Sequence, residues 1–425
     1  MPLTHLAMLS VHTSPLARLG GEKTGGMNVY IKELAQELGT RGIQVDIYTR
    51  RSDPELPDID HSLGNNVSVI HVPAGPPQVI GPDAVYPYLG SFTSWIKSTS
   101  QHRYQLIYSH YWLSGLVAEQ LSSTWRIPYV QMFHTLGHMK NRIIPGYMPP
   151  REPDLRIASE SQIIKSADRI IAATPAEHSQ LLWLYRADRR KIAIIPPGVN
   201  AARFYPIPME AAKEKLDIPL NTKLLLFVGR IEPLKAVDNI LHALKVVQQT
   251  TPNLLEQTIF TVIGGDPTNT DDAELQRLQA LTQQLGLTQS VRFIGAKNQE
   301  QLHLYYAAAL AVIMPSDYES FGMVALEAMA SGAPVIASQV GGLAFLVSDG
   351  ESGFLIPVRE PEFLAQRLCH LLSAPDEFSY MRIAAAERAK NYTWSAITDQ
   401  LLAVFDGIIS GQSNLDTAVT RPYPP

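Results

Sequence analysis

Two glutamates in the second half of the chain have the type and spacing to hold the hydroxyl groups of a sugar. Glu319 and Glu327 are eight residues apart, about 2.2 helical turns, so on one helix they would lie within about 80° of each other. Carboxylates accept hydrogen bonds from hydroxyl groups. The backbone N–H groups of Phe321, Gly322 and Met323, expected at a helix start, can meet an anion or a hydroxyl oxygen. Apolar neighbours favour a buried Glu327.

Two cations follow an apolar run at 224–229. Arg230 and Lys235 are five residues apart. The planar fork of an arginine and the point charge of a lysine together suit a diphosphate, and could neutralise it as a leaving group without a metal ion. Two solvated surface charges are the alternative. The position after a strand favours the binding interpretation.

The first half of the chain carries a glycine pair and several histidines. Gly25 and Gly26 precede a predicted helix at 28–42, whose free N–H groups could meet a phosphate, although a tight turn is the alternative. His134 and His138 follow a predicted strand, but no H-E-x-x-H spacing and no cysteine partner accompanies them. We therefore expect no zinc site. The acidic residues at 58–60 lie in a proline-rich loop, which favours exposure to solvent over metal binding.

The elements that must position these residues alternate between short apolar runs and amphipathic stretches, which is typical of βαβ units. Strands are predicted in the first half at 3–12, 45–50, 67–72, 106–110, 129–134, 169–174 and 192–198. After a proline-rich linker at 196–208, the pattern restarts with strands at 224–229, 257–265, 291–296, 310–316, 334–338 and 353–357. Helices are predicted at 114–122, 160–166, 237–249 and 320–332, and a last one at 392–410. The fold class is α/β, with two doubly wound parallel-sheet domains.

We place the domains at 1–198 and 199–392, with a flexible, proline-ending tail at 411–425. Ligands of such sheets bind beyond the carboxyl ends of the strands, so the loops that follow strands should carry the chemistry.

Composition limits the classes of function. The chain has 35 basic and 40 acidic residues, a net charge of −5, which gives no general attraction to nucleic acid or to anionic lipid. Its one cysteine excludes an internal disulfide and suits a reducing compartment. No apolar run is long enough to span a membrane, and the N-terminus has no secretory pattern. We expect a cytoplasmic protein that binds neither nucleic acid nor membrane.

Taken together, these motifs resemble the retaining glycosyltransferases of family four, which have the GT-B fold of two facing Rossmann-like domains. The resemblance rests on the segment ESFGMVALE, the VGR…K loop and the glycine pair in register, and runs from about Leu3 to Ser410. It implies a first domain that binds the acceptor and a second that binds the nucleotide sugar. It also implies that the last helix, about 393–410, crosses back onto the first domain.

The resemblance also implies residue roles. Arg230 and Lys235 would bind the donor diphosphate and Glu327 the ribose, while Glu319 and the backbone of Phe321 to Met323 would hold the sugar. Gly25 and Gly26 would approach the phosphates, and His134 would stabilise positive charge at the anomeric carbon. Lys140 and Arg156 match positions that hold an acceptor phosphate, and Tyr111 and Thr135 could add hydroxyl contacts. No carboxylate is placed as a nucleophile, so the expected transfer retains configuration and needs neither a metal ion nor a tightly bound cofactor.

Two subfamilies compete for the acceptor. Sucrose-phosphate synthases transfer glucose from UDP-glucose to fructose 6-phosphate, and the mycothiol-pathway enzymes transfer N-acetylglucosamine from its UDP donor to inositol 3-phosphate. The opening segment and Met27 favour the inositol-phosphate group. The segment HTLGHMK has the form of the sucrose enzymes, and the lysine that the inositol-phosphate group places shortly after AGP is missing. We favour sucrose-phosphate synthase, with the inositol-phosphate transferase as the alternative.

Rivals from other classes are a sugar-binding module without catalysis, a phosphorylase with pyridoxal phosphate, and a nicotinamide oxidoreductase. The last is disfavoured because neither half has the dinucleotide glycine fingerprint.

Overall fold

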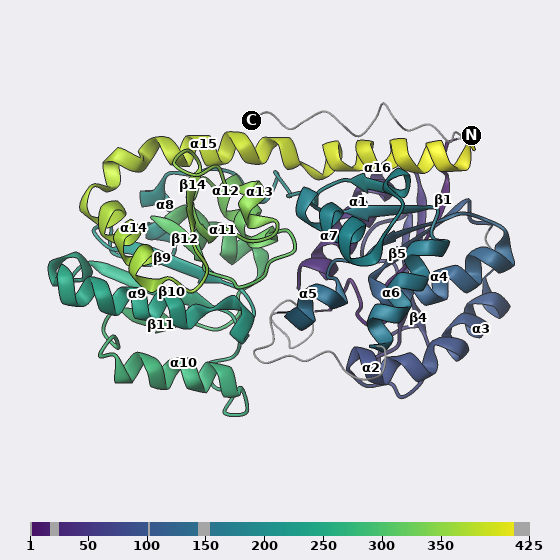
Figure 1. Ribbon diagram of the computed structural model, residues 1–425, viewed down its shortest axis with the longest axis horizontal. Helices are drawn as coiled ribbons and strands as arrows, with labels where there is room; N and C mark the ends of the chain where they lie inside the picture. The colour runs from purple at the N-terminus through teal and green to yellow at the C-terminus, as the bar shows by residue number, and fades with distance from the viewer. Residues whose placement is uncertain (1, 18–24, 101–102, 143–153, 412–425) are drawn as a thin grey trace. The chain divides into compact units, whose positions relative to one another are not determined.

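The computed structural model describes residues 2–17, 25–100, 103–142 and 154–411 (Figure 1). These residues divide into two compact units. Unit 1 contains the chain up to Ala17, Gly26–Gly198 and the chain from Trp394, and unit 2 contains Gly25 and Val199–Thr393. The tail predicted to be flexible lies, apart from Gly411, outside the described residues.

Unit 1 is built on an eight-stranded sheet with the order β3-β4-β2-β1-β5-β6-β7-β8. Its strands are β1 (His5–Leu9), β2 (Gln44–Arg50), β3 (Ile59–Asp60), β4 (Val67–Val72), β5 (Leu106–His110), β6 (Tyr129–Met132), β7 (Arg169–Ala172) and β8 (Ile192–Ile194). Its helices are α1 (Gly26–Thr40), α2 (Pro82–Val85), α3 (Leu89–Thr99), α4 (Tyr111–Trp125), α5 (Gly137–Arg142), α6 (Leu155–Ser166), α7 (Pro175–Tyr185) and α16 (Trp394–Ile409).

One strand of this sheet departs from the prediction. Residues 58–60 were expected to form a loop, yet β3 pairs antiparallel with β4 at the sheet edge, while the other pairings are parallel. A two-residue strand is too short to show an alternating pattern in the sequence. Asp58 is exposed, as expected, and forms an ion pair with Arg51.

The last helix packs on unit 1, which confirms the predicted return of the chain. The Asp406 carboxylate in α16 accepts a hydrogen bond of 3.1 Å from the backbone N–H of Leu3. The ring of Trp394 lies edge-on against Tyr30 of α1, with the ring centroids 5.3 Å apart. Figure 1 shows α16 in yellow beside α1. Unit 1 therefore includes a helix that follows the whole of unit 2 in the sequence.

Unit 2 is built on a parallel six-stranded sheet with the order β11-β10-β9-β12-β13-β14. Its strands are β9 (Lys223–Val228), β10 (Thr258–Ile263), β11 (Val291–Phe293), β12 (Ala311–Met314), β13 (Val335–Ser338) and β14 (Gly353–Ile356). Its helices are α8 (Met209–Lys215), α9 (Val237–Thr250), α10 (Ala273–Gln284), α11 (Gln299–Ala308), α12 (Met323–Ala330), α13 (Leu343–Leu346), α14 (Pro361–Ser373) and α15 (Ser379–Ala389).

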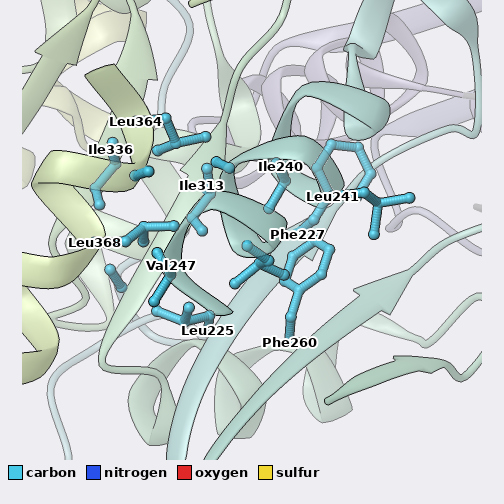
Figure 2. Packing of buried hydrophobic residues seen from close by; sticks show 14 of the residues in the cluster. Leu225, Phe227, Ile240, Leu241, Val247, Phe260, Ile313, Ile336, Leu364 and Leu368 are labelled. Carbon is cyan, nitrogen blue, oxygen red and sulfur yellow. The ribbon is translucent and has the colours of Figure 1, made fainter. Parts of the chain in front are cut away.

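The core of unit 2 shows why its strands read as continuous apolar runs. Leu225 and Phe227 of β9 point to one face of the sheet, where they pack against apolar residues of α9 and α14 (Figure 2). Leu224 and Leu226 are buried as well but stand outside this cluster, since side chains alternate along a strand. A parallel sheet covered on both faces needs apolar residues at every strand position.

In each sheet the strand order reverses at one point, which locates the edge where ligands bind. The switch lies between β1 and β5 in unit 1 and between β9 and β12 in unit 2. The loops that follow neighbouring strands at a switch point diverge and leave a crevice beyond the carboxyl ends. In unit 2 these are the loops with Arg230 and Lys235 after β9 and with Glu319 after β12. In unit 1 the residue directly after β5 is Tyr111.

Within the residues that the structure describes, no helix is long and apolar enough to cross a membrane.

Candidate active site

At the switch point of unit 2, the two loops meet through an ion pair. The Lys235 Nζ lies 2.5 Å from the Glu319 Oε2, although the two residues are 84 positions apart. Both side chains are largely covered, with exposed fractions of 19% and 15%. The sequence predicted both residues as site residues but not their pairing. A carboxylate and an ammonium group fixed together at this edge can bind sugar hydroxyl groups and phosphate oxygens side by side.

Arg230 stands on the same loop as Lys235 but has a different partner. Its guanidinium forms an ion pair of 2.6 Å with Glu232, and 43% of the arginine side chain is exposed. Glu232 was not among the predicted site residues. An acidic residue two positions after Arg230 on the same loop could have indicated an ion pair between them. Because the pair is half exposed, it contributes little to stability and can open at little cost when an anionic ligand binds.

The start of α12 differs from the expected geometry. The helix begins at Met323, and Gly322 precedes it in a left-handed conformation with φ 103°. Glu319 therefore lies in the loop before the helix, and the predicted helical angle between Glu319 and Glu327 does not apply. Gly322 ends the loop in a conformation that other residues adopt only with strain, which explains why sequence periodicity alone placed the start of the helix too early.

Glu327 lies inside α12 and is 6% exposed. Its Oε2 accepts a hydrogen bond of 3.0 Å from the hydroxyl of Tyr306 in α11. Burial, with the neighbouring Glu327 charge, raises the pKa of Tyr306 well above its ordinary value, so the hydroxyl keeps its proton and remains a donor. The expectation of a buried carboxylate is confirmed.

A second glycine pair, which the prediction missed, supports the Glu319 loop from the loop after β13. The Gly342 N–H donates to the Glu319 carbonyl at 3.1 Å. A Cβ at Gly341 would stand 1.9 Å from the same carbonyl oxygen, and one at Gly342 would stand 2.2 Å from the Phe321 Cα. Two residues without side chains are therefore required for this close approach. In the sequence, a Gly-Gly pair after a strand could have indicated that two backbone segments approach each other closely here.

Gly342→Ala is expected to destabilise unit 2 by about 1–3 kcal/mol, because the added methyl group must displace the Phe321 backbone. The conformation of Gly342 is ordinary, with φ −71°, so the effect is steric only. Urea unfolding of the variant measures the loss. Gly90→Ala serves as the control, since a Cβ at Gly90 meets no atom within 4 Å. Equal stability of the two variants would contradict this packing.

Gly25 and Gly26 stand where the prediction put them along the chain, directly before and at the start of α1, although Gly25 is grouped with unit 2 and Gly26 with unit 1. Residues 18–24 of the same loop lie outside the described residues. Asn28 in the first turn of α1 donates hydrogen bonds of 2.6 Å to the Thr13 Oγ1 and of 2.7 Å to the Ser14 carbonyl. The helix start is thereby tied to the loop that follows β1.

Three of the four predicted acceptor residues come together in unit 1. The Arg156 guanidinium donates to the Thr135 carbonyl at 2.7 Å and to the Thr135 Oγ1 at 3.0 Å. Its Cζ lies over the Tyr111 ring, 4.9 Å from the ring centre. Lys140 belongs to α5, but its side chain lies outside what the structure describes. We call Tyr111, Thr135 and Arg156 the arginine cluster.

Glu160 orients this cluster and was missed by the prediction. Its fully buried carboxylate accepts from Arg156 Nε at 2.8 Å, from the Gly137 N–H at 3.0 and 3.1 Å, and from the Tyr185 hydroxyl. Arg156 and Glu160 are spaced i and i+4 on α6, a pairing that the sequence could have indicated. One carboxylate thus fixes both the arginine head and the first residue of α5.

His134 is partly buried and hydrogen-bonded to His110, with 3.0 Å between the His134 Nε2 and the His110 Nδ1. Desolvation, with a smaller effect from His12, lowers the pKa of His134 to about 3. Burial lowers the pKa of His110 well below its ordinary value. Both imidazoles are therefore neutral at pH 7, so His134 adds no positive charge to the site. Its φ of 61° is left-handed, an unusual conformation for histidine.

In the described part of the chain, no three histidine, cysteine, aspartate or glutamate residues are grouped so that they could hold a metal ion.

Glu177, at the start of α7, is a buried carboxyl with a raised pKa. Desolvation raises the pKa of Glu177 to about 7, opposed by a hydrogen bond from the Ala173 N–H and assisted by the Glu160 charge. Its Oε1 has no hydrogen-bond partner among the described residues. The folded chain therefore keeps this proton at pH values where the unfolded chain has released it.

Wild-type stability relative to Glu177→Gln is expected to fall by about 2.5 kcal/mol as the pH rises from 5 to 8. A raised carboxyl pKa stabilises the folded chain below the ordinary value, and this contribution is lost as the pH passes through about 7. Urea unfolding at both pH values measures the difference. The exposed Glu55→Gln should keep the wild-type profile, and an unchanged profile in Glu177→Gln would refute the assignment.

Comparison with known proteins gives the family. Residues 208–390 match the family described as Glycosyl transferases group 1, and residues 25–198 match the Glycosyl transferase 4-like domain. The chain is 41% identical over 394 residues to the D-inositol 3-phosphate glycosyltransferase of Streptomyces scabiei (strain 87.22), covering 92% of this chain and 88% of the relative. The chain therefore belongs to the family-four, group 1 glycosyltransferases and is a glycosyltransferase.

A second relative and two solved structures extend this comparison. D-inositol 3-phosphate glycosyltransferase 2 of Catenulispora acidiphila is 41% identical over 396 residues, 92% of each chain. Sucrose-phosphate synthase from Thermosynechococcus elongatus superposes with a TM-score of 0.87 at 32% identity, over 96% of this chain and 100% of that one. Anabaena HepE, solved with UDP and glucose, has a TM-score of 0.72 at 19% identity, over 95% of this chain and 100% of that one, and shares the fold. These structures confirm the GT-B fold class.

The prediction of a sucrose-phosphate synthase is wrong. The relatives with 38–41% identity over nearly the whole chain are named D-inositol 3-phosphate glycosyltransferases, whereas the sucrose enzyme is a structural neighbour at 32%. The segment HTLGHMK, which favoured the sucrose enzymes, spans only residues 134–140. A local motif of this length carries less information on the acceptor than similarity across the chain.

Proposed function

We propose that this protein transfers a sugar from a nucleotide-sugar donor to D-inositol 3-phosphate. UDP-N-acetylglucosamine is the donor that the sequence resemblance implies. The observation that carries the proposal is the arginine cluster, a cation held by Glu160 and Thr135 and stacked on Tyr111 at the carboxyl edge of the sheet in unit 1. Charge-assisted hydrogen bonds from such a fork suit a phosphate monoester. The names of the relatives support inositol 3-phosphate as the acceptor that carries this phosphate.

In this proposal unit 1 binds the acceptor and unit 2 the donor. Lys235 and Arg230 hold the diphosphate, and Glu327 holds the ribose. Glu319, with the backbone of Phe321, Gly322 and Met323, holds the sugar, while Gly25 and Gly26 approach the phosphates. Lys140 joins Arg156 at the acceptor phosphate. The protein works in the cytoplasm, in keeping with its single cysteine.

The chemistry is transfer with retention of anomeric configuration and without a metal ion or a tightly bound cofactor. The bond from the anomeric carbon to the diphosphate oxygen breaks, and its electron pair leaves with the nucleotide. The acceptor hydroxyl forms the new bond on the same face and passes its proton to the departing phosphate. Lys235 and Arg230 stabilise the negative charge that develops on that phosphate. The neutral His134 ring and its backbone carbonyl can stabilise positive charge at the anomeric carbon without adding charge of the same sign.

A substrate panel tests the proposal. UDP-N-acetylglucosamine, UDP-glucose, ADP-glucose and GDP-glucose are each combined with D-inositol 3-phosphate, with myo-inositol and with fructose 6-phosphate, and products are identified by mass spectrometry. We expect efficient transfer from a UDP-sugar to inositol 3-phosphate alone. Release of UDP with acceptor present also separates an enzyme from a non-catalytic sugar-binding module. Transfer to fructose 6-phosphate only, or no transfer at all, would refute the proposal.

A further inference from the structure

Arg359, in the loop after β14, joins the two loops that carry the donor site of the proposed function. Its Nε and one terminal nitrogen donate to both oxygens of Asp317, at 2.8 and 2.6 Å. The other terminal nitrogen donates to Asp238 at 3.0 Å. The first terminal nitrogen also donates to the Pro233 carbonyl at 3.1 Å. One guanidinium thus links three segments that are far apart in the sequence.

The partners of Arg359 stand next to the residues proposed to act on the donor. Pro233 begins the 3-10 turn that ends at Lys235, and Asp238 lies in the first turn of α9. Asp317 precedes Glu319 by two positions, and its N–H donates to the Leu234 carbonyl at 2.9 Å. The Lys235 turn and the Glu319 loop are therefore joined twice beside their own ion pair, by the Leu234 carbonyl and by the Arg359 fork.

Two further observations separate this network from an ordinary surface ion pair. Arg359 has a φ of 58°, a left-handed conformation that costs an arginine about 1–2 kcal/mol. Such strain persists where surrounding contacts enforce it, and it often marks a functional site. The two aspartates are mostly covered, with exposed fractions of 17% and 16%. Arg277 adds a second cation to Asp238, at 3.2 Å. A fork that binds two carboxylates and a carbonyl at fixed angles needs arginine, since a lysine offers one point charge.

We infer that Arg359 is a positioning residue of the donor site, which holds the Lys235 turn and the Glu319 loop at the spacing needed to bind the donor diphosphate and sugar together. The inference rests on the proposed function. We do not place Arg359 in contact with the reacting atoms. It acts through Lys235 and Glu319, so its loss should weaken donor binding and turnover and leave acceptor binding unchanged.

The test measures UDP affinity by calorimetry and steady-state kinetics for Arg359→Gln and Arg359→Lys. Both variants are expected to bind UDP about tenfold more weakly and to lose about tenfold or more in kcat/KM for the donor, because small displacements of positioned groups are costly. The KM for the acceptor should stay at the wild-type value. Arg292→Gln is the matched control, because this exposed arginine on β11 donates only to the carbonyls of Thr288 and Val291 among the described residues.

A double-mutant cycle separates positioning from a general loss of stability. In a Lys235→Ala background, Arg359→Gln should weaken UDP binding by less than about threefold, since the lysine through which it acts is gone. Full additivity of the two losses, or wild-type UDP affinity in both Arg359 variants, would overturn the inference. Failure of the proposed function is distinguishable, because the wild-type protein would then bind no UDP or transfer no sugar.

Discussion

Lys235→Ala is expected to lower kcat for sugar transfer by about 10²–10³, the usual loss when one group that stabilises a developing negative charge is removed. The Lys235 ammonium is held by Glu319 at 2.5 Å and is 19% exposed, so it needs little rearrangement to meet the leaving diphosphate. Folding should be affected much less than turnover. The measurement is the rate of UDP release at saturating donor and acceptor, with urea unfolding run in parallel.

The ion pair complicates this variant, because removal of the lysine also leaves the Glu319 carboxylate without its partner. Lys235→Met/Glu319→Gln removes both charges, and its turnover should stay as low as that of Lys235→Ala. Lys245→Ala is a matched control on α9, whose ammonium donates to Gln248 and to the Leu285 carbonyl. Arg230→Ala should also suppress turnover without unfolding the chain. Wild-type turnover in Lys235→Ala and Arg230→Ala would defeat the assignment of both cations.

Arg156→Gln is expected to raise the KM for D-inositol 3-phosphate by about 10–100-fold, since hydrogen bonds to charged groups contribute about 1.5–3 kcal/mol each. The affinity for UDP should stay unchanged, because UDP binding is assigned to unit 2. We expect wild-type transfer to unphosphorylated myo-inositol to be slow, and Arg156→Gln should leave its rate unchanged, since this acceptor lacks the phosphate that Arg156 is proposed to bind. Steady-state kinetics with both acceptors measure the difference between the two effects of the substitution.

The control for Arg156 must account for Glu160. This carboxylate is fully buried, and loss of its cationic partner is strongly destabilising, by about 3–5 kcal/mol in comparable pairs. Arg156→Gln/Glu160→Gln removes both charges and leaves no unpaired buried carboxylate, so it should restore stability without restoring acceptor affinity. An equal loss of rate with phosphorylated and unphosphorylated acceptor would show that Arg156 supports the fold and not phosphate recognition.

Much of the fold could be predicted because buried parallel strands consist of consecutive apolar residues in the sequence. The segments LLLF, IFTVI and VSVIHV are apolar or nearly so, and β9, β10 and β4 lie at those places. The predicted helices at 114–122 and 160–166 are longer in the structure, where α4 and α6 extend to Tyr111 and Leu155. The start of α6 is set by the Asp154 side chain, which accepts from the N–H groups of Arg156 and Ile157. Capping side chains of this kind determine where a helix begins. The spacing of apolar residues does not reveal them, because caps are polar.

The sequence indicated the residue types of the candidate site but not their contacts. Lys235, Glu319 and Thr135 follow strands, and parallel strands bring their carboxyl ends to one edge of a sheet. Arg156 lies on α6, and the roles of all four residues stay predictions. The pairing of Lys235 with Glu319 joins residues 84 positions apart, and no local pattern encodes such a contact. Glu160 was within reach through its i, i+4 spacing from Arg156.

The acceptor could not be read from single residues, because both candidate acceptors carry a phosphate and need the same cations. Met27 favoured one subfamily, and the form of HTLGHMK favoured the other. Specificity is a difference between the affinities for two acceptors, and two motifs that point to different subfamilies do not give that difference. Identity of 41% over 92% of the chain compares all the loops together.

The most direct test of the central claim is a product analysis with UDP-N-acetylglucosamine and D-inositol 3-phosphate in buffer that contains EDTA, followed by NMR of the isolated sugar. We expect one UDP to be released for each glycosyl inositol phosphate formed, with the anomeric configuration of the donor retained. Inversion at the anomeric carbon, a requirement for added divalent metal, or UDP formed without a glycosylated inositol phosphate would contradict it.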